Sequence, residues 1–194
     1  MEKTIQSLLV IGLGKVGSLV AILLHENGYA VTGLTREVSG DVPFKLILAD
    51  SSDMEQLKKA IGEHDAVVSC LPYHLNLNVA KAAHNAGKHY FDLTEDVLTT
   101  EKVRELAKTS KGLMAPQCGL APGFIGIVGA DLTKGMDKLR SIELRVGALP
   151  MHPRGLLGYA FNWSPEGVVN EYLNDCEVIQ DGQRARVPAM ENLE

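Results

Sequence analysis

The sequence of 194 residues predicts an α/β fold built on a doubly wound parallel sheet. Segments of strand and helix character alternate from the N-terminus to about residue 116. The first strand, over residues 5–11, is a continuous apolar run, as expected of a parallel strand buried on both faces. A glycine-rich turn over residues 12–17 then leads into a helix. Right-handed crossovers between such units place helices on both faces of the sheet.

The predicted elements of this first region are short and separated by turn residues. Gly28 and Gly87 follow two of the helices, where glycine commonly ends a helix. The side chains of Asp50, Ser51, Ser52 and Asp53 are candidate caps for the helix that follows them. We expect strands over residues 5–11, 29–34, 44–49, 66–71, 89–93 and 113–115, and helices over 14–27, 54–61, 75–86 and 100–110.

The pattern changes to a mixed α+β type after residue 117. We expect a helix over 119–132, a half-exposed strand over 139–146, and a helix capped by Ser164 with Pro165 at its first position. Residues 177–180 and 183–187 predict a hairpin around Asp181–Gly182. The chain ends just after this hairpin, so we expect a first domain over 1–118 and a partial α+β substrate or dimerisation domain over 119–194.

Composition and charge narrow the classes of partner. The net charge of −5 argues against a nucleic-acid partner, because such proteins usually carry basic patches. The apolar run over residues 8–11 is too short for a signal peptide or a membrane helix, so we expect a cytoplasmic protein with no membrane partner. Three widely spaced cysteines, Cys70, Cys118 and Cys176, favour reduced thiols over disulfides, and no metal site is predicted.

The turn over residues 12–17 has the sequence G-L-G-K-V-G, which matches the dinucleotide-binding pattern G-x-G-x-x-G. In this pattern Gly12 permits the tight turn, Gly14 lets the backbone approach a pyrophosphate, and Gly17 lets the helix pack against the strand. Lys15 and Val16 begin that helix, whose N-terminal N–H groups attract phosphate. The first domain is therefore predicted to be a Rossmann domain that binds NAD(P).

Two residues after the second strand bear on the choice of coenzyme. An acidic residue is expected there to bind the ribose 2′-hydroxyl of NAD, but the sequence has Thr35 and Arg36. A guanidinium suits the 2′-phosphate of NADP, so we favour NADP. NAD stays open, because Glu37 is close by.

Two further loops are expected to line the coenzyme. Asp50 and Ser51 follow the third strand and reach its adenine side. Cys70, Leu71 and Pro72 follow the fourth strand, at the edge where open sheets bind ligands. A packing role suits Cys70 better than a nucleophilic one.

Five segments together resemble the saccharopine dehydrogenase family, in particular its short bacterial members, which include enzymes similar to lysine 6-dehydrogenase. They are V-I-G-L-G-K-V-G at 10–17, D-A-V-V-S-C-L-P-Y at 65–73, G-L-A-P-G at 119–123, V-G-A-L-P at 146–150 and Y-A-F-N-W-S-P-E-G at 159–167. The resemblance spans essentially the whole chain, although family members are considerably longer. It implies a C-terminally truncated member, a homodimer, and hydride transfer between NAD(P) and a carbon–nitrogen centre of a lysine-type or saccharopine-type amino acid.

The catalytic acid or base is not decided by the sequence. Tyr73, His74, Glu95 and Cys118 follow strand ends, but a capping, solvated or packing role is open for each of the last three. The substrate is expected to contact a loop of Gly119, Leu120, Ala121, Pro122 and Gly123, which can equally serve packing, and to contact Tyr159, Asn162 and Trp163. Arg145, His152 and Arg154 are available for a substrate carboxylate.

Three functions remain open at this point. The chain is an oxidoreductase of this family, a dinucleotide-binding module without turnover, or a Rossmann enzyme with another small substrate. The segments after residue 117 argue against the third.

Overall fold

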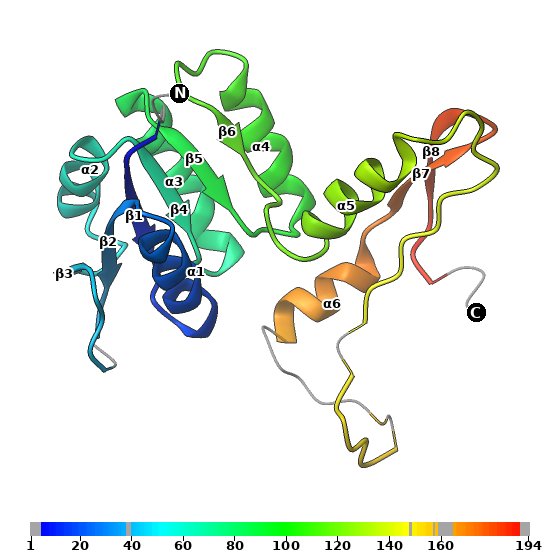
Figure 1. The fold of residues 1–194 in the computed structure, drawn as a ribbon, viewed down its shortest axis with the longest axis horizontal. Helices are drawn as coiled ribbons and strands as arrows, with labels where there is room; N and C mark the ends of the chain where they lie inside the picture. The colour runs from blue at the N-terminus through cyan, green and yellow to red at the C-terminus, as the bar shows by residue number, and fades with distance from the viewer. Residues whose placement is uncertain (1–4, 38–39, 148, 157, 159–164, 191–194) are drawn as a thin grey trace.

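The computed structural model describes residues 5–37, 40–147, 149–156, 158 and 165–190, and its centre is a six-stranded parallel sheet (Figure 1). The strand order β3-β2-β1-β4-β5-β6 confirms the predicted doubly wound Rossmann fold. The strands are β1 (Ser7–Ile11), β2 (Ala30–Thr35), β3 (Lys45–Leu48), β4 (Ala66–Ser69), β5 (His89–Asp92) and β6 (Met114–Ala115).

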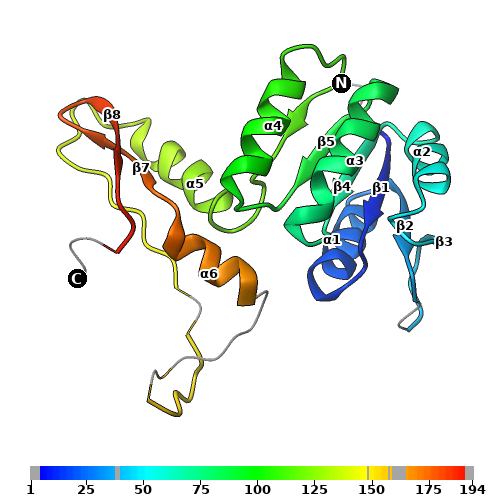
Figure 2. The same cartoon turned by 180° about the vertical axis from the view of Figure 1, so that it is seen from behind.

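Four helices accompany this sheet and lie unequally on its two faces. They are α1 (Lys15–Glu26), α2 (Met54–Gly62), α3 (Tyr73–Ala86) and α4 (Val97–Ala107). In the described part of the chain, α2, α3 and α4 lie side by side on one face, while the other face carries α1 (Figures 1 and 2). The prediction of helices on both faces is therefore confirmed.

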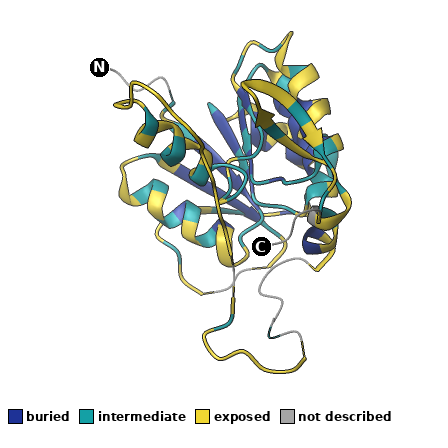
Figure 3. Cartoon of the chain, turned by 90° about the vertical axis from the view of Figure 1, so that its right-hand side faces the viewer, coloured by how far each residue is buried: buried dark blue, intermediate teal, exposed yellow. Residues whose placement is uncertain are grey.

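The core follows from the alternation of side chains along the central strand. Leu9 and Ile11 point to the face of α2 to α4 and join the larger buried cluster. Val10 points the other way and packs with Ala21 of α1 and Val31 of β2. A strand buried on both faces has to be apolar throughout, which explains the unbroken apolar run. Figure 3 shows the buried residues gathered in the sheet and in the helix surfaces that face it.

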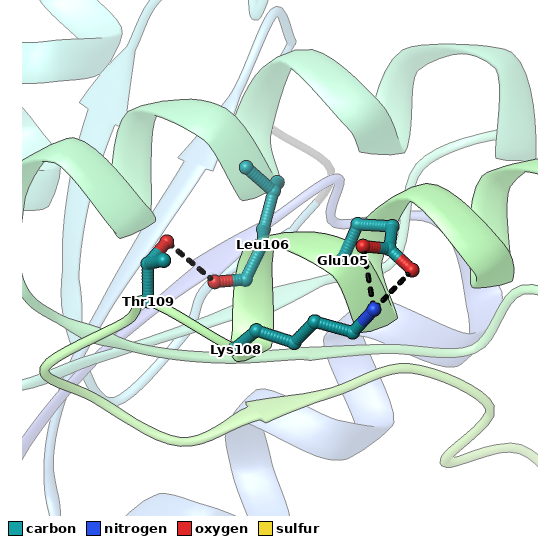
Figure 4. Close-up of polar contacts among 4 residues, drawn as sticks. All are labelled: Glu105, Leu106, Lys108 and Thr109. Carbon is teal, nitrogen blue, oxygen red and sulfur yellow. Dashed lines mark hydrogen bonds and ion pairs between the residues drawn. The ribbon is translucent and has the colours of Figure 1, made fainter.

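Two of the predicted cap positions are occupied as expected. Among the predicted cap candidates it is Asp53 that caps α2, because its carboxylate accepts hydrogen bonds from the N–H groups of Glu55 and Gln56. Gly87 ends α3 in the left-handed conformation, as predicted. At the end of α4, Lys108 forms an ion pair with Glu105 at 2.7 Å, and the Thr109 hydroxyl donates to the Leu106 carbonyl (Figure 4).

The second part of the chain comprises α5 (Phe124–Thr133), α6 (Pro165–Leu173) and the hairpin of β7 (Cys176–Gln180) and β8 (Gln183–Val187). The predicted hairpin and the helix start at Pro165 are confirmed, whereas the predicted cap, Ser164, lies outside the described residues. The apolar helix α5 buries none of its residues, and Ile127 is 71% exposed. No helix in the described residues is both long and apolar enough to cross a membrane.

The predicted strand over residues 139–146 is wrong. The structure has no strand there, and Ile142, Leu144 and Val146 of its apolar pattern are exposed. A strand needs a partner to satisfy its backbone, and none of the described segments pairs with this one. The predicted helix at 119–132 begins later, at Phe124, because residues 119–123 form a separate loop.

Candidate cofactor and substrate site

The glycine loop joins β1 to α1 at the point where the strand order reverses. Gly12 has φ +88°, a conformation that disfavours any side chain, and its N–H donates to the Leu34 carbonyl of β2 at 2.9 Å. The Ser18 hydroxyl donates to the Leu13 carbonyl at 3.0 Å and steadies the loop from within α1. The turn is therefore anchored to both its neighbouring strand and its own helix.

The other two glycines of the pattern meet different surroundings. A Cβ on Gly17 would collide with the Gly12 carbonyl oxygen, so this glycine serves close packing of helix and loop. A Cβ on Gly14 would meet no atom within 4 Å, so the space beside Gly14 is open. Gly14 is also the N-cap of α1 and offers no side-chain cap, which leaves the first-turn N–H groups to a ligand. The loop thus fits the diphosphate of a dinucleotide.

A cleft of about 320 Å³ continues from this loop over the ends of β2 and β3. Several predicted cofactor residues line it, namely Gly12, Gly14, Thr35, Arg36, Ser51 and Leu71. The remaining predicted cofactor residues, Lys15, Val16, Gly17, Asp50, Cys70 and Pro72, are not part of this lining. The cleft also contains Glu37, which kept NAD open as a coenzyme.

The charge of Arg36, which lines the cleft, acts on Asp50, which lies outside the lining. Asp50 accepts a hydrogen bond from the Ser52 N–H at 2.8 Å. Bonds from Ser52 lower the pKa of the Asp50 carboxyl, and the positive charge of Arg36 lowers it further. Asp50 is therefore ionised near neutral pH, and its negative charge interacts with the Arg36 guanidinium.

Cys70 directly follows β4 and lies against the glycine loop. A Cβ on Gly17 would lie 3.1 Å from the Cβ of Cys70, which shows how closely the thiol side chain supports the loop. Burial raises the pKa of the Cys70 thiol to about 12. A thiol that stays protonated at neutral pH is a poor nucleophile, which favours the packing role. Pro72, two residues later, is the N-cap of α3.

A second polar cluster lies at the carboxyl ends of β5 and β6. Asp92 is fully buried there and accepts hydrogen bonds from the Tyr90 hydroxyl at 2.7 Å and the Thr94 N–H at 2.9 Å. Burial raises the pKa of the Asp92 carboxyl, and these bonds oppose the rise. Asp92 was not singled out from the sequence as a site residue. The available signal was an acidic residue closing a strand that has Tyr90 on the same face.

Two of the predicted catalytic candidates lie around Asp92. Burial raises the pKa of Glu95, and the charges of Asp96 and Asp92 raise it further. Burial also raises the pKa of the Cys118 thiol, with a contribution from Asp92. The other two candidates, Tyr73 and His74, begin α3 and pair with each other, with ring centroids 5.8 Å apart.

The loop from Gly119 to Gly123, which also contains Leu120, Ala121 and Pro122, is closed by its own hydrogen bonds. The N–H groups of Phe124 and Ile125 donate to the Gly119 and Leu120 carbonyls. A Cβ on Gly123 would collide with the Gly119 carbonyl oxygen. The first N–H groups of α5 are thus paired inside the loop, which supports the packing interpretation of this motif over ligand binding.

The structure does not describe the remaining predicted substrate residues, because Tyr159, Asn162 and Trp163 lie outside the described residues. Arg145, His152 and Arg154 are exposed, and Arg145 pairs with Glu143 at 2.9 Å.

Comparison with known proteins accounts for both parts of the chain. The model of the saccharopine dehydrogenase NADP-binding domain matches residues 8–115, and that of the saccharopine dehydrogenase C-terminal domain matches residues 119–194. The chain belongs to the saccharopine dehydrogenase family. Its first domain is an NADP-binding domain, as the residues after the second strand favoured.

Curated members of the family are similar to most of the chain. A saccharopine dehydrogenase [NADP(+), L-glutamate-forming] of Schizosaccharomyces pombe is 26% identical over 163 residues, which cover 81% of this chain and 36% of the relative. An alpha-aminoadipic semialdehyde synthase of Arabidopsis thaliana is 28% identical and covers 75% of this chain and 14% of the relative. The chain thus spans much less than half the length of these relatives.

One solved structure supports the fold. Apo saccharopine dehydrogenase (L-Glu forming) from Saccharomyces cerevisiae aligns with a TM-score of 0.62 at 22% sequence identity. The alignment covers 94% of this chain and 44% of that structure. The architecture of the family therefore extends through the second part of the chain.

Proposed function

We propose that this chain is part of an NADP-dependent oxidoreductase that transfers hydride at a carbon–nitrogen bond of a saccharopine-type or lysine-type amino acid. The observation that carries the proposal is the open space beside Gly14, at the N-terminus of α1 and continuous with a cleft that contains Arg36. Relatives whose names include NADP(+) and saccharopine support the coenzyme and the substrate class.

Different residues of the glycine loop and the cleft bind different parts of the coenzyme. The glycine loop and the first turn of α1 bind the diphosphate through N–H groups and the helix dipole. The Arg36 guanidinium binds the 2′-phosphate in a charge-assisted contact. We assign Ser51, which lines the cleft from the facing loop, to the adenosine of the coenzyme.

The proton chemistry is assigned to the end of β5. Bound NADPH supplies the hydride to an imine carbon, and the imine nitrogen then needs a proton. The raised pKa of Glu95 lets its carboxyl keep a proton more readily than an exposed glutamic acid does. Glu95 is thus the preferred donor, with Cys118 beside the same buried carboxylate as the alternative.

A module that binds NADP without turnover is the second candidate. The observation that favours it is the contrast between the two parts of the chain. The glycine loop of the first part is packed and anchored by hydrogen bonds, whereas α5, in the second part of the chain, buries none of its residues. A substrate site needs walls that exclude water, and α5 does not provide one by itself.

The test combines binding and turnover in the full chain. NADPH and NADH are titrated by nicotinamide fluorescence into the wild type, Gly14→Val and the control Gly62→Val, whose Cβ would also meet open space but away from the cleft. We expect Gly14→Val to keep its melting temperature and to bind NADPH at least about tenfold more weakly. Gly62→Val should bind like the wild type.

Turnover then separates the two candidates. NADPH oxidation is followed with aminoadipate semialdehyde plus glutamate, and NADP reduction with saccharopine or lysine. Turnover supports the oxidoreductase, and binding without turnover supports the module. Failure of folded wild-type protein to bind either coenzyme would overturn the proposal.

A further inference from the structure

The carboxylate of Asp92 joins three separate segments at the carboxyl edge of the sheet. Its Oδ2 accepts from the Tyr90 hydroxyl of β5 at 2.7 Å. Its Oδ1 accepts from the N–H of Thr94, in the loop before α4, at 2.9 Å and from the N–H of Gln117, after β6, at 3.1 Å. The side chain is fully buried, so water does not replace these bonds.

The bond to Gln117 falls where the chain leaves the sheet for its second part. Gln117 has φ +63°, a left-handed conformation that costs energy in a residue with a side chain. The next residue is also anchored to Asp92, because the Cys118 N–H donates to the Asp92 main-chain carbonyl at 2.7 Å. Two adjacent peptide groups are therefore held by one residue of β5.

We propose that Asp92 is a positioning residue that sets the exit of the chain from the sheet and thereby places Glu95 and Cys118 at the substrate side. The hydrogen bond from the Thr94 N–H to Asp92 positions Glu95, the next residue in the chain. The hydrogen bond from the Gln117 N–H to Asp92 positions Cys118 in the same way. The description of this edge as the substrate side rests on the proposed function. The bonds themselves do not.

The charge of Asp92 provides a readout that simple packing would not change. The titratable groups on which its charge acts are Tyr90 on β5, Glu95 in the following loop and Cys118 after β6, and Asp96 in that loop acts on Glu95. Among these, Cys118 is an exposed residue whose thiol, although partly shielded, can be reached by an alkylating reagent. Because burial and the Asp92 charge both raise the pKa of its thiol, removing the charge should lower that pKa.

The first experiment measures alkylation of Cys118 by iodoacetamide against pH, by mass spectrometry, in a Cys176→Ser background. Asp92→Asn keeps the shape of the side chain and an oxygen acceptor but removes the charge. We expect its alkylation midpoint to move to lower pH, with a rate about threefold higher below the midpoint. Asp96→Asn is the matched control, because it removes a charge from the same loop while Asp96 binds Thr99 and not Gln117. An unchanged Asp92→Asn profile would overturn the proposal, as would an equal shift in the control.

A second experiment uses amide hydrogen exchange and includes the unmodified protein. The Gln117 and Cys118 amides should be protected in the wild type, and Asp92→Ala should speed exchange of the Gln117 amide at least about tenfold. The Gly12 amide, bonded to Leu34 on the far side of β1, should not change. Rapid exchange at Gln117 in the wild type contradicts the proposal even if the variant does not fold. Both experiments omit the coenzyme, so their outcome is independent of whether NADPH binds.

Discussion

The Gly17 Cα faces the carbonyl oxygen of Gly12 so closely that a Cβ on Gly17 would collide with it. Gly12 is itself held by its N–H bond to Leu34, and a Cβ on Gly17 would also approach the Cβ of Cys70, just after β4, to 3.1 Å. The first turn of α1 therefore lies against the backbone that follows β1 and the side chain that follows β4. The loop therefore has no room for an additional methyl group at Gly17.

Gly17→Ala should destabilise the fold as well as weaken coenzyme binding. The added methyl group meets backbone atoms that cannot move aside, and overpacking of this kind costs about 1–3 kcal/mol. Chemical denaturation measures the loss, and Gly62→Ala is the control because its Cβ would meet open space. Wild-type stability in Gly17→Ala would show that the loop is looser than the structure indicates.

Arg36→Ala should change the choice between coenzymes. Loss of a charge-assisted contact to the 2′-phosphate predicts binding of NADPH about ten- to a hundredfold weaker, with little change for NADH. Asp50→Asn should act in the opposite direction, because it removes a negative charge that acts on Arg36 and would repel a phosphate bound there. Isothermal titration of both coenzymes tests this pair. Equal losses for NADPH and NADH in Arg36→Ala would remove the assigned role.

Asp65→Asn should lower stability at neutral pH but not in acid. Hydrogen bonds from the Ser7 and Gln6 N–H groups and from the Ser7 hydroxyl lower the pKa of the Asp65 carboxyl below its usual 3.8. The ionised group therefore stabilises the fold above pH 3.8, and this contribution is lost as the pH falls through the lowered pKa.

Melting curves of Asp65→Asn and wild type measure this dependence. At pH 7 the variant should melt on the order of a few degrees lower, and the two curves should converge below pH 3.8. Asp131→Asn is the control, because Asp131 forms an exposed ion pair with Lys134 that should contribute little. A difference that persists unchanged into acid would contradict the assigned origin.

Much of the first domain was predictable because its signals are local. The strand run from Leu8 to Ile11 and the glycine spacing at 12, 14 and 17 each specify a backbone geometry that few other residues permit. The failed strand at 139–146 shows the limit of such signals. An alternating pattern marks a half-buried surface only when another strand lies beside it.

The candidate site was less predictable for the same reason. Asp92 and Gln117 are 25 positions apart, and neither has a motif that marks it. They meet because β5 and β6 are neighbours in the sheet. The sequence by itself determined the strand–loop–helix unit, which depends on contacts within a few residues. It also determined that a positive charge, that of Arg36, follows the second strand. Only the tertiary structure decided which carboxylate is buried, which thiol it faces, and which amides are hydrogen-bonded within the G-L-A-P-G loop. Burial and hydrogen-bond partners depend on how segments are brought together in space, and many of those segments are distant in the sequence.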